Sequence, residues 1–345
     1  MFRRVPTATI MGAILLAGCS IETPQSPTTP GAWLKSLPVV EKVEPWARPD
    51  GNAGLVVHTA HYRLFTTVSD PLVLRRVPVF LESALRAYRE TAGVDAWPKE
   101  PLVVYLFAER ADWETFTDEW AGPAANLYRR IQAGAYFLNG ATVAYYLDRR
   151  TSFSVLAHEG WHQYAQQTFA LRLPAWLDEL MAIQFEAFTW DRGLVTFDPS
   201  RNGSRLLALK QNMAAGQVLD IDQLLPLDAG RMLSLPSPTD GSPRAVSGYY
   251  AQLYALGRFL REAAYGRHLL DLQALLQDAA AGNWPLTDAQ RQGATPTTGN
   301  PSRHWNAQVG PLLFRRYITQ TPADLDEPYR AFCRRILAGV SFETP

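Results

Sequence analysis

Residues 154–164 read SVLAHEGWHQY and place the pattern His-Glu-x-x-His at His158, Glu159 and His162. The segment is predicted to be helical, and in a helix with about 3.6 residues per turn, positions four apart lie on one face. Both imidazoles can therefore bind one zinc ion at about 2.1 Å. The carboxylate of Glu159 can then take a proton from zinc-bound water as that water attacks a carbonyl. The alternative is two histidines that pack at a helix interface beside a solvated Glu159.

A zinc hydrolase uses three protein ligands and leaves the fourth position for water, so a third ligand is expected downstream. After a turn at residues 171–174, the segment 175–182 (AWLDELMA) predicts a second helix that folds back over the first. Its first turn offers Asp178 and Glu179, which lie about 100° apart around a helix. The apolar residues beside them fix the buried side only loosely. Periodicity alone therefore leaves both carboxylates open as the third ligand.

The segments before the motif predict a small mixed β-sheet with helices over residues 55–150. The β-rich stretch 61–67 and the apolar run 102–107 are typical of strands, and Asp70-Pro71 is typical of a helix start. Asn139-Gly140, between the apolar segments 135–138 and 142–147, indicates a β-hairpin.

The chain is predicted to be mainly helical over residues 151–345. The motif helix is expected to begin with a cap at Thr151 or Ser152, a further helix is expected at 249–265, and 200–245 reads as loop-rich. The expected fold class is α+β, with a small mixed β-sheet subdomain followed by a mainly helical subdomain that carries the metal site.

The N-terminus predicts export and lipidation. Residues 1–19 read MFRRVPTATIMGAILLAGC, in which two arginines precede an apolar run that is too short to span a bilayer and ends in small residues. The last four residues resemble a bacterial lipobox, which implies a signal peptide with an acylated Cys19. An ordinary secretory signal is the alternative. Residues 20–54 are rich in Pro, Thr, Ser and Gly, and predict a flexible tether.

Composition excludes several classes of protein. The 345 residues include 33 Lys+Arg and 33 Asp+Glu, so no basic excess favours nucleic-acid binding. Two cysteines cannot form a disulfide-rich scaffold, and Cys333 is expected to be a core residue. The sequence contains no Gly-x-Ser-x-Gly and no phosphate-binding loop. Attachment to the membrane is expected to rest on the acyl chains, because no polybasic run is present.

The motif together with Trp176-Leu177-Asp178-Glu179 resembles the gluzincin metallopeptidases, and more narrowly the bacterial peptidase MA-like domains. In the gluzincins a glutamate in a Trp-Leu-x-Glu context is the third ligand, so the resemblance implies Glu179 and a zincin-like fold. Two residues depart from the family pattern. Leu180 stands where glycine is usual, and Gly160 stands inside the motif helix where a bulkier residue is common.

Other residues are weaker candidates. The gluzincin resemblance implies a Tyr or His that donates a hydrogen bond to the oxyanion, and Tyr249 and Tyr250 are candidates, of which Tyr250 is chosen. The alternative is that both are core aromatics of an amphipathic helix. Glu186 lies seven residues after Glu179 on the same helical face and can orient a ligand histidine, or form an ordinary salt bridge. The strand at 142–147 is expected to be a sheet edge that pairs with an extended peptide.

The sequence thus predicts a zinc metallopeptidase that is anchored by lipid to the bacterial cell envelope, at the periplasmic face of the outer membrane. Its expected substrate is a peptide or protein, and Zn²⁺ is its expected cofactor. Two alternatives use the same residues. One is an envelope binding or assembly lipoprotein that holds zinc without turnover, and the other is a hydrolase of a non-peptide amide.

Overall fold

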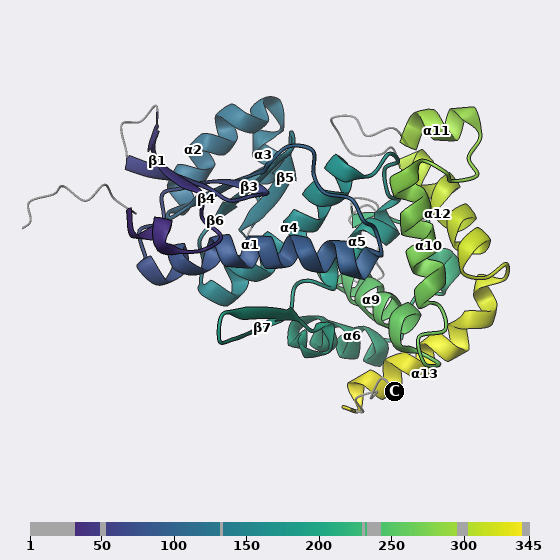
Figure 1. Ribbon diagram of the computed structural model, residues 1–345. Helices are drawn as coiled ribbons and strands as arrows, with labels where there is room; N and C mark the ends of the chain where they lie inside the picture. Colours follow the sequence, from purple (N-terminus) through teal and green to yellow (C-terminus); the bar gives the residue numbers. More distant parts are fainter. Residues whose placement is uncertain are drawn as a thin grey trace, which may run out of the picture.

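Six strands in the first half of the chain form a mixed sheet, and the chain after them is mainly helical (Figure 1). The computed structural model describes residues 32–48, 53–131, 134–229, 232, 243–294 and 303–339. The sheet order is β1-β2-β3-β4-β6-β5. The strands are β1 (Lys42–Ala47), β2 (Ala53–His58), β3 (Tyr62–Thr66), β4 (Leu102–Phe107), β5 (Ala135–Leu138) and β6 (Ala141–Tyr145).

The central strands β3, β4 and β6 are parallel, whereas β1, β2 and β5 run antiparallel to their neighbours. The hairpin predicted at Asn139-Gly140 is β5–β6, and both of these turn residues have positive φ, as a tight hairpin turn requires. A second, two-stranded sheet consists of β7 (Phe188–Asp191) and β8 (Leu194–Phe197).

Helices cover both faces of the large sheet and build the rest of the molecule. In Figure 1, α1 runs along one face and α2 with α3 along the other, while α9 to α13 gather at the far end. The α-helices are α1 (Pro71–Ala92), α2 (Arg110–Ala121), α3 (Ala125–Tyr128), α4 (Arg149–Thr168), α5 (Ala175–Ile183), α6 (Gly203–Ala214), α7 (Ile221–Leu224), α9 (Pro243–Glu262), α10 (Leu269–Ala281), α11 (Asp288–Ala294), α12 (Arg303–Tyr317) and α13 (Asp326–Leu337). The 3-10 helices are η1 (Ala32–Ser36), η2 (Gly122–Ala124), η3 (Pro199–Arg201) and η4 (Pro322–Leu325).

Short side chains with oxygen acceptors start the two longest helices near the sheet. Asp70 caps α1 by accepting a hydrogen bond from the backbone N–H of Leu72, as the sequence predicted for this helix start. The motif helix α4 is capped by Asp148, whose carboxylate accepts from two backbone N–H groups. The predicted caps Thr151 and Ser152 therefore lie inside the helix, and Asp148 begins it a turn earlier.

The structure corrects three expectations. Strand β1 and the preceding η1 lie within residues 20–54, where a tether was expected, so ordered structure begins before Leu55. The segment 200–245, read as loop-rich, contains α6 and α7. Strand β6 lies between β4 and β5, so the sheet edge on this side is β5 and not the segment 142–147.

The signal sequence, Cys19 and residues 20–31 lie outside the described residues. Among the helices that the structure describes, none combines the length and apolar character needed to cross a bilayer.

Candidate metal centre

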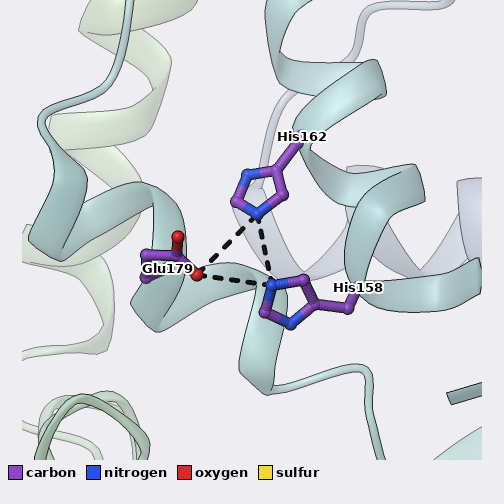
Figure 2. A group of neighbouring side chains, drawn as sticks. All are labelled: His158, His162 and Glu179. Carbon is purple, nitrogen blue, oxygen red and sulfur yellow. Dashed lines mark hydrogen bonds and ion pairs between the residues drawn. The ribbon is translucent and has the colours of Figure 1, made fainter. Parts of the chain in front are cut away.

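Two helices bring three potential metal ligands together. His158 and His162 lie one turn apart on α4, and Glu179 faces them from α5 (Figure 2). The two Nε2 atoms are 3.3 Å apart, and they lie 3.3 and 3.8 Å from Oε2 of Glu179. One atom from each residue falls within 4.8 Å of the others. This group can hold a metal ion.

The carboxylate of Glu179 supports that assignment by an independent observation. Its Oε2 atom is buried and accepts no hydrogen bond from any residue in the described part of the chain. A buried carboxylate oxygen without a donor is costly unless a cation lies beside it. Two imidazoles and a carboxylate also form a donor set that suits zinc. The residues present therefore fit a divalent metal ion.

Asp178 is the other carboxylate that the helical periodicity allowed as third ligand. It contacts the ring nitrogen of His162 that points away from Glu179. Its Oδ2 atom lies 3.0 Å from Nδ1 of His162, and its Oδ1 atom accepts a hydrogen bond of 2.9 Å from the indole N–H of Trp161. Because Nδ1 of His162 is engaged in this way, Nε2 is the atom that points to the metal position.

Glu186 makes the corresponding contact to the other histidine. Its Oε1 atom lies 3.0 Å from Nδ1 of His158. The sequence placed Glu186 on the same helical face as Glu179, but α5 ends at Ile183, so Glu186 reaches His158 from the turn after the helix. Asn202 and Arg205, from the start of α6, donate further hydrogen bonds to the same carboxylate. Each imidazole therefore lies between two carboxylates. His158 lies between Glu179 and Glu186, and His162 lies between Glu179 and Asp178.

These carboxylates dominate the electrostatics of the histidines. Burial acts to lower the pKa of His158, but the carboxylates of Glu179 and Glu186 beside it outweigh burial and raise the pKa to about 10. Burial also acts to lower the pKa of His162. Asp178 and Glu179 outweigh burial, so the pKa of His162 is raised as well. The site therefore strongly favours positive charge between its carboxylates.

Glu159 and Tyr250 face the same cavity as the three potential ligands. The cavity has a volume of about 550 Å³. Burial raises the pKa of Glu159 despite the opposing effect of the two histidines, and the nearby Glu179 together with burial raises that of Tyr250. Aromatic and apolar side chains also line the cavity: Tyr128, Ile131, Tyr136, Phe137 and Leu173.

The two tyrosines proposed from the sequence lie in different surroundings. Tyr249 is fully buried, and its hydroxyl donates to the carbonyl of Leu227, as a core residue does. Tyr250 lines the cavity, and the guanidinium of Arg205 lies 5.1 Å from the centre of its ring. Of the pair, Tyr250 is therefore the one able to meet a bound molecule.

Buried contacts that sequence reasoning missed hold α4 against the sheet. The amide of Gln163, the residue after His162, donates to the carbonyls of Val103 and Gly140. On another face of α4, Tyr88 of α1 donates to the carbonyl of Ala157. The only local signal for Gln163 was an amide directly after the motif, because its partners Val103, Gly140 and Thr142 are all more than 20 residues away.

The two departures from the gluzincin pattern have structural reasons. A Cβ atom at Gly160 would lie 2.6 Å from the hydroxyl of Tyr88, so glycine lets α1 approach the motif helix closely. Leu180 is fully buried against Gly257 of α9, where a Cβ atom would lie 2.6 Å from the Gln184 side chain and 3.0 Å from that of Leu180. The small residue at this helix contact therefore lies on α9 and not on α5.

The fold and the site define a class: an α+β protein with a mixed N-terminal sheet and a possible His-His-Glu metal group in its helical part. Comparison with known proteins adds no narrower assignment, since no family model matches the chain and no curated protein matches its sequence significantly.

Proposed function

We propose that this protein is a zinc-dependent metallopeptidase of the gluzincin type with a zincin-like fold. The observation that carries the proposal is the buried Oε2 atom of Glu179, which has no hydrogen-bond donor and lies beside two imidazole nitrogens. A zinc ion held by His158, His162 and Glu179 would supply a Lewis acid for a carbonyl and lower the pKa of a coordinated water.

The chain's own residues have the chemistry for the remaining steps. Glu159 neighbours a ligand and lines the cavity, and as a carboxylate it can accept a proton from attacking water and pass it to the leaving amine. Tyr250 lines the same cavity and keeps its proton at neutral pH, since Glu179 and burial raise its pKa. Its hydroxyl can therefore donate a hydrogen bond to the oxygen of the carbonyl under attack.

The sheet edge suggests how a peptide would lie. Strand β5 is the outermost strand on this side, and its residues Ala135, Tyr136 and Phe137 line the cavity. An extended peptide can add to such an edge through backbone hydrogen bonds. We place the substrate strand beside β5, and keep the lipid anchor at Cys19 and the periplasmic face of the outer membrane as part of the same proposal.

The test separates metal binding from turnover. The wild-type chain and Glu159→Gln are purified without chelating resin, and both are measured for zinc content and for cleavage of a mixed quenched-fluorescence peptide library. Both should bind about one zinc, whereas the variant should lose hydrolysis about 10²–10⁴-fold. Glu119→Gln, at an exposed glutamate of α2, makes the same chemical change outside the cavity and should leave both values unchanged.

Two results would overturn the proposal. Cleavage by Glu159→Gln at the wild-type rate would remove Glu159 from the mechanism. Zinc-loaded wild type that cleaves no peptide would favour a binding lipoprotein, or a hydrolase that acts on a non-peptide amide if such a compound is turned over.

A further inference from the structure

One guanidinium connects the possible metal group to the cavity tyrosine. Arg205 lies in the first turn of α6, within the segment 200–245 that was predicted to be loop-rich. Its Nε and Nη2 atoms donate hydrogen bonds of 2.8 and 2.5 Å to the two carboxylate oxygens of Glu186, which in turn contacts Nδ1 of His158. Its Cζ atom also lies 5.1 Å from the ring centre of Tyr250.

The carboxylate of Glu186 is fully used by these contacts. Oε1 meets His158 and Arg205, and Oε2 meets Arg205 and the side-chain amide of Asn202 at 2.8 Å. The Glu186 side chain is only 10% exposed, so its orientation depends on these donors and not on water. A bidentate guanidinium fixes the plane of a carboxylate in a way that a single ammonium donor cannot.

Contacts at both ends of α6 hold Arg205 in place relative to α9, the helix that carries Tyr250. Before α6 begins, the carbonyl of Pro199 accepts a hydrogen bond of 2.8 Å from the hydroxyl of Tyr254. Toward its end, Asn212 lies against Gly248, where a Cβ atom would come within 2.7 Å of the asparagine side chain. Both contacts join the α6 region to α9, so they place the Arg205 side chain beside Tyr250.

We infer that Arg205 is a positioning residue of the site, which sets the orientation of His158 through Glu186 and supports the ring of Tyr250 with its guanidinium. The effect on His158 depends only on metal binding by His158, His162 and Glu179, and not on peptidase activity. The effect on Tyr250 rests on the proposed function.

The test begins with metal affinity, measured by competition with a chromophoric zinc chelator on folded full-length protein. Arg205→Met should weaken zinc binding about 10–100-fold, the usual loss when the partner of a metal-ligating histidine is disturbed. Lys210→Met is the matched control, because it removes one positive charge from an exposed position of the same helix. It should bind zinc as the wild type does.

Two further variants separate positioning from general destabilisation. If Arg205 acts through Glu186, adding Arg205→Met to Glu186→Gln should weaken zinc binding no further than the more damaging single change. Arg205→Lys restores the charge without the bidentate fork, and should recover only part of the affinity. It also provides a folded variant should Arg205→Met not fold, which circular dichroism and the melting temperature would show.

Three outcomes would overturn the inference: wild-type zinc affinity in folded Arg205→Met, additive losses in the double variant, or full recovery by Arg205→Lys. These readouts do not depend on peptide cleavage. If Arg205→Met loses zinc affinity as expected while no form cleaves any peptide, the proposed function fails and the positioning of His158 by Arg205 stands.

Discussion

Replacing Gly160 by alanine tests whether the approach of Tyr88 to the motif helix sets the packing of the site. Alanine is favoured over glycine inside a helix by about 0.5–1 kcal/mol, so an isolated helix would be stabilised. In this protein the new Cβ atom would lie 2.6 Å from the Tyr88 hydroxyl, well inside an ordinary contact of 3.4–4 Å. Tyr88 is fully buried, and its hydroxyl donates a hydrogen bond of 2.7 Å to the carbonyl of Ala157.

The unfavourable contributions outweigh the gain in helix propensity. Overpacking a core by one methyl group costs about 1–3 kcal/mol, and a buried hydroxyl displaced from its acceptor adds to that cost. We expect Gly160→Ala to lower the free energy of unfolding by about 2 kcal/mol. In Tyr88→Phe the clashing oxygen is gone and the nearest ring carbons lie 3.5 and 3.6 Å from the Cβ position. There the same change should stabilise the protein by up to about 1 kcal/mol.

A double-mutant cycle measured by urea unfolding, at a fixed zinc concentration, gives the answer. The expected signature is a reversal of sign: Gly160→Ala destabilises the wild type and stabilises Tyr88→Phe. Gly160→Ala that stabilises both backgrounds would refute the close contact. Equal losses in both would show that the cost at Gly160 does not arise from the Tyr88 hydroxyl.

Two further changes probe the surroundings of the site. Asp178→Asn should weaken zinc binding about tenfold, because an amide replaces the carboxylate that faces Nδ1 of His162. The control Asp191→Asn, at an exposed position, should bind zinc as the wild type does. Equal zinc affinity in all three proteins would contradict the role of Asp178. Cys333, which is fully buried and has its pKa raised by burial to about 12, should stay a protonated thiol at pH 8. In a chain of residues 20–345 a thiol reagent should therefore modify it only after denaturation, and rapid reaction of the native protein would contradict that burial.

Much of the possible metal group was accessible from sequence because it depends on local geometry. The spacing of His158 and His162 fixes their relation through the helical repeat alone. The helical periodicity could not distinguish Glu179 from Asp178 as the third ligand. Only the resemblance to gluzincins selected Glu179. In the structure the two carboxylates take different places on opposite sides of His162, which a helical projection of α5 alone cannot reveal.

The features that were missed depend on long-range contacts. Strand β1 contains Pro45, which speaks against a strand in the sequence, but β1 is an edge strand, where a missing N–H is tolerated. The β5–β6 hairpin was predicted, yet a hairpin signal does not say which of its strands pairs with β4. Arg205 follows Glu186 by 19 residues, and no spacing rule connects them.

The contact between Leu180 and Gly257 shows how a departure from a motif can preserve a site. The gluzincin pattern usually has glycine directly after the glutamate ligand, and a leucine there would be expected to push away the helix that packs against it. Gly257 provides the space instead, because it offers no side chain where Leu180 enters α9. The helices therefore stay close enough for Glu179 of α5 and Tyr250 of α9 to line one cavity. At the α5–α9 contact of this protein the small residue is Gly257, and the Leu180 side chain fills the space beside it.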